Sequence, residues 1–376
     1  MAEREKVTVY PYNKVFAPFI KYFSDFNDRL AIGSLVSPKG FCLAGKDAGT
    51  VDNRGLLNLS VTNDLQEAIA QDDAFLAVDG EYGQSVRSNV FKGIDRAIEL
   101  GKNIYCALPL SPDERQEIET KCAENKLTFK YYGREVDNGD ATAAEGKKLY
   151  RPSVPVIFVG DLFDRLNSLD VLLSLRKAFA DEGHRVCSIG VPPCCGLLNM
   201  HPMPLLFMQP QYGEVDKIRF FNNYIRLLEK QERPDIIMIQ LPGGMMKFND
   251  VITNGFGVHS YMISQAITPD FFVLSVPYEM ADSKLCAMIN ENFKYRFGFE
   301  IDCIQMSNAR MDTIKAFEDE KLAFSYMPQH RVDATIRELR ACAAIDLFNI
   351  FNEEDREALS RKAIQSLSGY GIVQVI

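Results

Sequence analysis

Residues 154–179 read VPVIFVGDLFDRLNSLDVLLSLRKAF, and this stretch decides the class of fold. An apolar run is followed by a glycine, a polar turn and a segment in which apolar residues recur at helical spacing. A strand that leads through such a turn into a helix is the unit from which parallel α/β sheets are built. The same unit carries the phosphate-binding loop of P-loop proteins.

The turn lacks the lysine that a phosphate-binding loop uses. The pattern GxxxxGK[ST] needs a second glycine for close approach to phosphate and a lysine for the terminal phosphates. Counted from Gly160, the last three positions hold Arg165, Leu166 and Asn167, and with one more loop residue they hold Leu166, Asn167 and Ser168. Backbone N–H groups at a helix N-terminus bind anions without a lysine. Gly160, Arg165 and Ser168 are therefore candidate ligand-binding residues.

Three interpretations of this turn stay open. In the first, Gly160 only makes the turn, and Asp161, Asp164 or Asn167 caps the helix. In the second, the turn is a degenerate phosphate or acyl-phosphate site, and in the third it belongs to a working NTPase. Gln240 follows the strand DIIMI at the place where a P-loop NTPase has its magnesium-binding acid, which disfavours the third.

A second glycine-rich loop, residues 240–261, follows that strand. Gly243 and Gly244 permit a backbone path close to a ligand. Lys247, Asn249 and Asn254 come after the carboxyl end of a parallel strand, where open α/β sheets bind ligands. We expect these residues to form one pocket with the Gly160 turn, in which Lys247 supplies the missing positive charge. The alternative is an ordinary loop with glycines at turns and asparagines as caps.

The alternation of strand-length apolar runs and helical segments predicts two α/β domains. Residues 1–132 are predicted to form a Rossmann-like N-terminal domain, with strands at 6–12, 30–37, 74–80, 103–110 and 127–132. Residues 133–153 lose apolar periodicity and are the expected linker. Residues 154–376 are predicted to form a P-loop-like parallel-sheet domain with a degenerate phosphate loop. Its strands are expected at 154–160, 184–191, 234–243, 269–278, 302–308, 322–328 and 371–376, and its helices at 167–182, 213–231, 257–266, 281–296, 331–344 and 353–366.

A further glycine-rich loop spans residues 37–55 in the N-terminal domain. Lys39, Lys46 and Asp47 make it a candidate for binding an anion or a peptide, and a plain surface loop is the alternative. The dinucleotide fingerprint GxGxxG is absent from the first strand–helix junction, which reads YPYNKVFAP.

Composition narrows the classes of partner. The formal net charge is −9 over 376 residues without a cluster of Lys and Arg, which argues against a nucleic-acid partner. No apolar run of about 18 residues is present, and the charged start has no signal-peptide core, so we expect no membrane partner and a cytoplasmic protein. Small molecules or proteins are the expected partners.

The cysteines are expected to be reduced thiols, because a cytoplasmic chain rarely keeps disulfides. His184, Cys187, Cys194, Cys195 and His201 occur close together in the sequence. Adjacent cysteines do not readily ligate one ion, and no CxxC pair is present, so we expect no metal site. A thiol or metal protein built on these cysteines is a weaker alternative.

Several stretches together resemble a family of clostridial peptide maturation system proteins. They include VYPYNKVFAPFIKY, SLVSPKGFCLAGKDAG, PDIIMIQLPGGMMKFNDVITNGFGV and YRFGFEIDCIQMSN. The resemblance implies a protein that accompanies a radical SAM maturase acting on a Cys-rich, bacteriocin-like precursor peptide. It assigns no catalytic residue and no cofactor. The second half is also distantly similar to P-loop proteins.

The expected function is therefore an accessory binding protein that interacts with the precursor peptide or the maturase. An enzyme of P-loop descent that uses a nucleotide or an acyl-CoA-type ligand is the alternative. A homodimer is an open alternative for the state of assembly.

Overall fold

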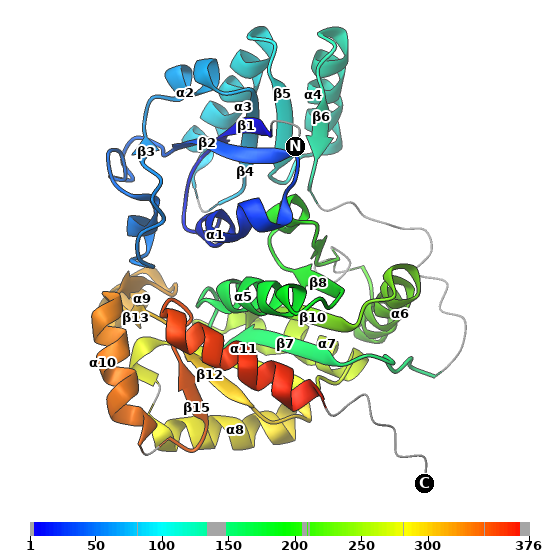
Figure 1. Cartoon of the computed structure of the whole chain (residues 1–376), viewed down its shortest axis with the longest axis vertical. Coiled ribbons are helices and arrows are strands. Elements are labelled where there is room, and N and C mark those ends of the chain that lie inside the picture. The colour runs from blue at the N-terminus through cyan, green and yellow to red at the C-terminus, as the bar shows by residue number, and fades with distance from the viewer. Residues whose placement is uncertain are drawn as a thin grey trace. The chain divides into compact units, whose positions relative to one another are not determined.

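The computed structural model describes residues 4–80, 82–133, 148–204, 209, 211–280, 282–341 and 343–368. The chain divides into two compact units (Figure 1). The first unit comprises Met1–Arg134 and Pro192–Pro202, and the second comprises Glu135–Val191 and Met203–Ile376. Most of the expected linker, residues 134–147, lies outside the described residues.

The first unit contains a six-stranded sheet of order β3-β2-β1-β4-β5-β6, in which all strand pairs are parallel. Its strands are β1 (Glu5–Tyr10), β2 (Leu30–Val36), β3 (Val61–Thr62), β4 (Ala74–Val78), β5 (Asn103–Ala107) and β6 (Phe129–Tyr131). This order is that of a Rossmann sheet, in which the chain reverses its direction of travel between β1 and β4. The expected Rossmann-like fold is confirmed.

Helices cover both faces of this sheet. They are α1 (Ala17–Phe26), α2 (Leu65–Gln71), α3 (Gln84–Glu99) and α4 (Pro112–Glu124), with a 3₁₀ turn η1 at Ala48–Val51. Ile69, Ile94 and Ile118, from α2, α3 and α4, share one buried cluster with the strands, and Figure 1 shows α1 on the other side of the sheet. α4 begins with a capping box between Ser111 and Glu114, as its sequence predicts.

A short segment from later in the chain completes the first unit. It contains a 3₁₀ turn, η2 (Pro193–Leu198), and a short strand, β9 (His201–Pro202). The Asn27 side chain donates a hydrogen bond to the Leu197 carbonyl (2.8 Å), and the Asn199 side chain donates one to the Phe26 carbonyl (2.9 Å). These bonds hold the segment against α1.

The parallel sheet of the second unit has the strand order β15-β12-β11-β7-β10-β8. Its strands are β7 (Val156–Asp161), β8 (Val186–Gly190), β10 (Ile236–Gly244), β11 (Phe271–Val276), β12 (Cys303–Met306) and β15 (Asp346–Phe348). β7 lies in the centre, between β10 and β11, and every residue of β7 is buried. The strand that leads into the Gly160 turn is thus the core of a P-loop-like parallel-sheet unit.

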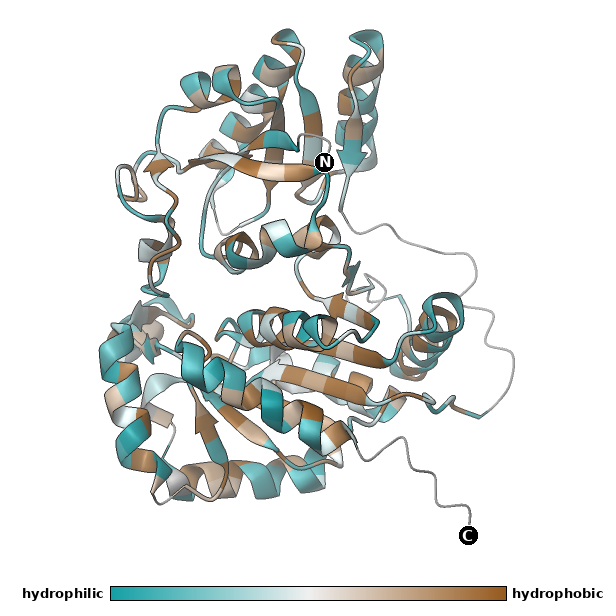
Figure 2. Cartoon of the chain, in the orientation of Figure 1, coloured by the Kyte–Doolittle hydropathy of each residue, from teal (hydrophilic) through white to brown (hydrophobic). Residues whose placement is uncertain are grey.

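Helices lie on both faces of this sheet: α5 and α11 pack together on one face, and α6, α7 and α8 form a row on the other (Figure 1). The helices are α5 (Ser168–Asp181), α6 (Glu214–Glu232), α7 (Val258–Ala266), α8 (Ser283–Phe297), α9 (Thr313–Asp319), α10 (Gln329–Arg340) and α11 (Glu353–Leu367), with short turns η4 (Asn254–Gly257) and η5 (Tyr278–Met280). Figure 2 shows apolar strands between helices whose outer faces are polar. That pattern is expected when both faces of a parallel sheet are covered.

One expected strand belongs to a different sheet. Residues 322–328 contribute β14 (Phe324–Tyr326), which pairs antiparallel with β13 (Ala309–Met311) in a separate two-stranded sheet. The strand expected at 371–376 lies outside the described residues. In the part of the chain that the structure describes, no helix is both long enough and apolar enough to cross a bilayer.

Candidate functional site

The two glycine-rich loops of the second unit meet at the carboxyl edge of its sheet. β7 and β10 are parallel neighbours, and the chain continues from each into its loop. The Met245 N–H donates to the Asp161 carbonyl (3.0 Å), and the Met246 N–H donates to the Leu162 carbonyl (3.1 Å). The loop after β10 therefore lies directly beside the turn after β7, which makes this corner the candidate site.

Gly160 and Gly244 serve close packing within the corner. A Cβ atom on Gly160 would stand 2.7 Å from the Met245 sulfur. A Cβ atom on Gly244 would stand 2.8 Å from the Asp164 backbone nitrogen and 3.0 Å from the Asn254 side chain. The backbone contact makes glycine necessary at position 244 whether or not a ligand binds, whereas at position 160 the flexible Met245 side chain would have to move.

Apolar side chains fill the turn between β7 and α5. Leu162 and Leu166 are each 1% exposed and Phe163 is 4% exposed. The Phe163 ring packs edge-on against Phe248, with ring centroids 5.5 Å apart. In a phosphate-binding loop the backbone wraps an open space for phosphate. Here Leu166, which stands at the second glycine position of the longer register, is part of the hydrophobic core.

The chain's own carboxylate takes the place of an anion at the start of α5. The two Asp161 oxygens accept hydrogen bonds from the Ser168 N–H (3.0 Å) and the Ser168 hydroxyl (2.9 Å). The Leu166 backbone also hydrogen-bonds this carboxyl group. A helix N-terminus favours negative charge. Of the three caps considered from the sequence, the buried Asp161 is the side chain that accepts from the first backbone N–H of the helix.

Burial raises the pKa of Asp161 from 3.8 to about 7, although the hydrogen bonds from Ser168 act in the opposite direction. Desolvation of the charged form outweighs those bonds because the carboxyl group is only 7% exposed. The group that occupies the corner therefore changes its protonation near neutral pH.

Gln240 completes a buried polar chain. Its amide nitrogen donates to the Ser168 hydroxyl (3.0 Å), and its amide oxygen accepts from the Val191 N–H (2.8 Å). In P-loop NTPases the serine hydroxyl and the acid at the strand end hold magnesium. Here the Ser168 hydroxyl donates to Asp161 and accepts from a neutral amide. Nothing in this pair of side chains favours a cation.

Asn167, at the lysine position of the longer register, is also engaged. Its side-chain oxygen accepts a hydrogen bond from the hydroxyl group of Ser307, the residue after β12 (2.6 Å). Arg165 has a left-handed backbone (φ 70°) and its guanidinium donates to Asp164 (3.1 Å). The arginine that could have supplied charge to the turn is thus paired with the neighbouring acid.

The predicted polar residues of the second loop mostly shape the loop itself. The Asn249 side chain accepts from the Val251 and Ile252 N–H groups (2.9 and 2.6 Å). The Asn254 side chain donates to the Met246 carbonyl (2.8 Å). Gly243 has a φ of 69°, a conformation that favours glycine.

Lys247 lies on the surface of this loop and forms an ion pair with Asp250 (2.6 Å). Half of the lysine side chain is exposed, and Asp250 is 92% exposed. Such exposed pairs contribute little free energy, so the ammonium group remains available to a ligand.

The remaining predicted residues belong to the other unit. Lys39 and Lys46 are exposed, and Asp47 accepts hydrogen bonds from the Gly49 and Leu57 N–H groups (2.8 and 2.9 Å). Asp47 is therefore a cap within its loop. The structure divides the predicted ligand-binding residues between two units.

In the first unit, a side chain bridges the two strand ends at which a Rossmann sheet binds its ligand. At the carboxyl ends of β1 and β4, the Asn13 side chain donates to the Pro11 carbonyl (2.8 Å) and the Asp79 carbonyl (3.1 Å). A Cβ atom on Gly80 would stand 2.4 Å from the Asn13 nitrogen. This bridge between the two strand ends replaces the glycine-rich fingerprint, whose absence the sequence shows.

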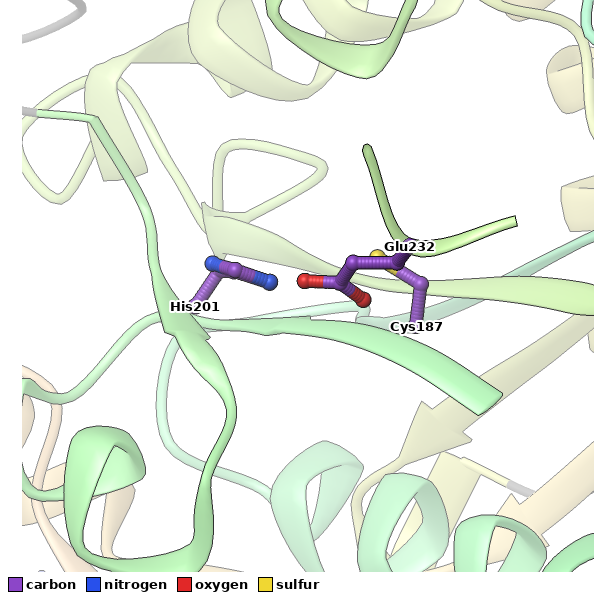
Figure 3. Close-up of side chains that lie close together, drawn as sticks. All are labelled: Cys187, His201 and Glu232. Atoms are coloured by element: carbon purple, nitrogen blue, oxygen red, sulfur yellow. The ribbon is translucent and has the colours of Figure 1, made fainter. Parts of the chain in front are cut away.

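Figure 3 draws the side chains of Cys187, His201 and Glu232. Cys187 and Glu232 belong to the second unit and His201 to the first, so the group is not a site of either unit. Burial, and then the Glu232 carboxylate, raise the pKa of the Cys187 thiol. Zinc binds the thiolate form of cysteine, which a raised pKa disfavours. We therefore assign no metal to this group.

Burial also raises the pKa of the Cys194 thiol. Cys194 and Cys195 are 1% and 0% exposed and lie in η2 of the first unit. Reactive cysteines are exposed and have lowered pKa values. Cys194 and Cys195 are therefore buried residues that serve packing.

No protein-family model matches the sequence, and no curated protein does. Among solved structures, the fold is similar to that of a DUF1611 family protein from Anabaena variabilis, with a TM-score of 0.60 and 10% identity over 96% of this chain and 100% of the other. Two further similarities are weaker. A GTPase in apo form from Pyrococcus abyssi gives a TM-score of 0.30 (14% identity, 58% of this chain, 98% of the other), and chloroplast FtsY from Physcomitrella patens gives 0.25 (12%, 65%, 71%). The chain shares the fold of the DUF1611 protein over nearly its whole length, and the likeness extends to the fold alone.

Proposed function

We propose that this protein is an accessory binding protein of a system that matures ribosomally synthesised, bacteriocin-like peptides, and that its P-loop-like unit takes no nucleotide. The observation that carries the proposal is the filled corner. Asp161 holds the N-terminus of α5, and Leu166 is buried where a glycine would open the loop. The peptide and maturase partners rest on the sequence resemblance to clostridial peptide maturation proteins.

The filled corner supports a binding role over the alternative of a P-loop-derived enzyme. Phosphate catalysis needs a lysine, a magnesium ion and backbone donors that face the nucleotide. In this corner the Ser168 N–H and hydroxyl donate to Asp161. Gln240 stands on the neighbouring strand where a P-loop enzyme has its acid.

The first test measures nucleotide binding. Titration calorimetry of the full-length chain with MgATP, MgGTP and acetyl-CoA, each at millimolar concentration, is expected to give no binding heat. The second test applies where a short Cys-rich reading frame is found beside this gene: its peptide is labelled with fluorescein, and its binding is measured by anisotropy. We expect a dissociation constant near micromolar, about −8 kcal/mol, and no binding of a scrambled peptide of the same composition.

The two results together decide between the candidates. Binding of MgATP or acetyl-CoA without binding of the peptide would replace the accessory role by the P-loop-derived enzyme. A pull-down with the purified radical SAM maturase separates a protein that holds the peptide from one that docks on the maturase.

A further inference from the structure

An open groove lies on the second unit beside the filled corner. It has a volume of about 620 Å³ and is lined by the loop after β10 and by α8: Met246, Lys247, Met288, Glu291, Asn292, Tyr295 and Arg296. Met246 also donates its N–H to Leu162 in the turn after β7. One wall of the groove is therefore fixed to the rigid corner, and the other is a helix.

α8 presents apolar side chains on its outer face. Ile289, Phe293 and Phe297 are buried and pack in the core. Met288 and Tyr295, seven residues apart and so about two turns along one face, are 68% and 80% exposed. A solvated helix face is normally polar. Methionine adapts its shape to different apolar ligands, and tyrosine offers an amphipathic contact area.

A left-handed turn adds a third exposed apolar side chain, Phe256, beside the groove. Asn254, Gly255, Phe256 and Gly257 have φ values of 47°, 59°, 54° and 65°. This conformation is unfavourable for a bulky L-residue, and the Phe256 side chain is 53% exposed, so burial does not explain its presence.

The same turn is tied to the groove. The Phe256 N–H donates to the Thr253 carbonyl (2.7 Å), and the guanidinium group of Arg296, a groove residue, donates to the Phe256 carbonyl. Arg296 also stacks on the Phe297 ring at 5.2 Å. The strained turn is held in place by the helix that lines the groove, with the aromatic side chain left on the surface.

The charges of the groove identify the occupant. Its lining carries Lys247 and Arg296 against Glu291. Lys247 also pairs with Asp250 (2.6 Å), whose side chain is 92% exposed, and a ligand carboxylate can replace this weak surface partner. Two cationic groups beside exposed methionine and aromatic side chains complement a ligand that carries a carboxylate next to an apolar group. An open groove suits a chain segment, because small-molecule sites enclose most of their ligand.

We infer that this groove binds a peptide segment in which an aromatic or aliphatic side chain stands beside Asp or Glu. The apolar side chain contacts Met288 and Tyr295, and the carboxylate pairs with Lys247. The inference rests on the proposed function in that it gives the binding protein a peptide surface.

The test selects short random peptides displayed on phage against the full-length chain. Enriched sequences are expected to combine Phe, Leu or Met with Asp or Glu. Their affinity, measured by fluorescence anisotropy, should fall at least about tenfold with Tyr295→Ala or Lys247→Glu, as for a central interface residue. Phe317→Ala removes an aromatic ring that is 71% exposed on α9, so this matched control should leave the affinity unchanged.

The inference would be overturned by the absence of an enriched sequence, by enrichment of basic peptides, or by an equal loss of affinity in Phe317→Ala. Light scattering is measured in parallel, because a dimer that Tyr295→Ala dissociates would assign the groove to a second copy of the chain. The failure of this inference and the failure of the proposed function can be told apart. Nucleotide binding would refute that function without touching the groove, and a failed selection would leave the filled corner as it stands.

Discussion

The substitution Asp161→Asn isolates the buried carboxyl group of the corner. Burial raises the pKa of Asp161 from 3.8 to about 7 in the folded protein, and in the unfolded chain the group returns to its ordinary value. The folded state binds this proton more tightly than the unfolded state. The group therefore contributes stability that is fully present below pH about 4 and is lost as the pH rises through about 7.

The magnitude follows from the size of the shift. From 3.8 to about 7 is about three pKa units, and each unit corresponds to about 1.4 kcal/mol, so the whole effect is about 4 kcal/mol. Between pH 5 and pH 7.5 the contribution should fall by about 2.5 kcal/mol. Asparagine retains an oxygen that accepts from the Ser168 N–H and has no titrating proton. The difference in unfolding free energy between wild type and Asp161→Asn should therefore change by that amount.

Urea unfolding followed by circular dichroism, at half-unit steps of pH, measures this difference. Asp235→Asn is the control. Hydrogen bonds from Arg185 lower the pKa of Asp235 to about 2, so this carboxyl group is ionised throughout the interval and its variant should run parallel to wild type. If Asp161→Asn also runs parallel to wild type within about 0.5 kcal/mol, the carboxyl group does not titrate there and the account of the corner is wrong.

Other substitutions test the packing of the corner and the turn. Gly244→Ala should lower the free energy of unfolding by about 1–3 kcal/mol, because the new methyl group meets a backbone nitrogen. Gly160→Ala should lower it by less, because its methyl group meets a flexible side chain, and equal effects in urea unfolding would contradict this. Asn167→Lys should not create MgATP binding in calorimetry, because the lysine alone does not empty the filled turn, and a micromolar dissociation constant would refute that reasoning. Phe163→Ala should lower the free energy of unfolding by about 3–5 kcal/mol, because it empties a buried position. Phe256→Gly should not lower it, because glycine replaces an exposed residue in a left-handed conformation, and thermal unfolding compares the two variants.

Local pattern was sufficient for most of the architecture. The five strands expected in the first half correspond to β1, β2, β4, β5 and β6, because long apolar runs between turn signals are strong indicators. β3 and β15 have only two and three residues, which is short for a period to show. β6 also has three residues, and it was expected because it lies within the stretch LTFKYY, residues 127–132. The segment 322–328 has a strand pattern, but its pairing partner is set by tertiary structure, and sequence pattern cannot distinguish the main sheet from a separate hairpin.

At the candidate site, the sequence identified the corner and the missing lysine, and it named Asp161 among three caps. It did not indicate that Leu166 and Phe163 enter the core, because a turn residue is buried only when neighbouring loops close over it. The groove was also missed. Met288 and Tyr295 stand on the outer face of a helix whose inner face is equally apolar. Their spacing assigns them to a face different from that of the buried residues, and this was the available signal.

The segment Pro192–Pro202 has a consequence for how the protein can be made. The first unit needs it, because Asn27 and Phe26 of the first 30 residues are hydrogen-bonded to Leu197 and Asn199. A ribosome that has produced only residues 1–133 has therefore not yet supplied one side of that unit, and a truncated gene ending there would leave α1 uncovered, with an apolar surface prone to aggregation. The Rossmann-like unit reaches its final state only after the first strands of the second unit have been translated.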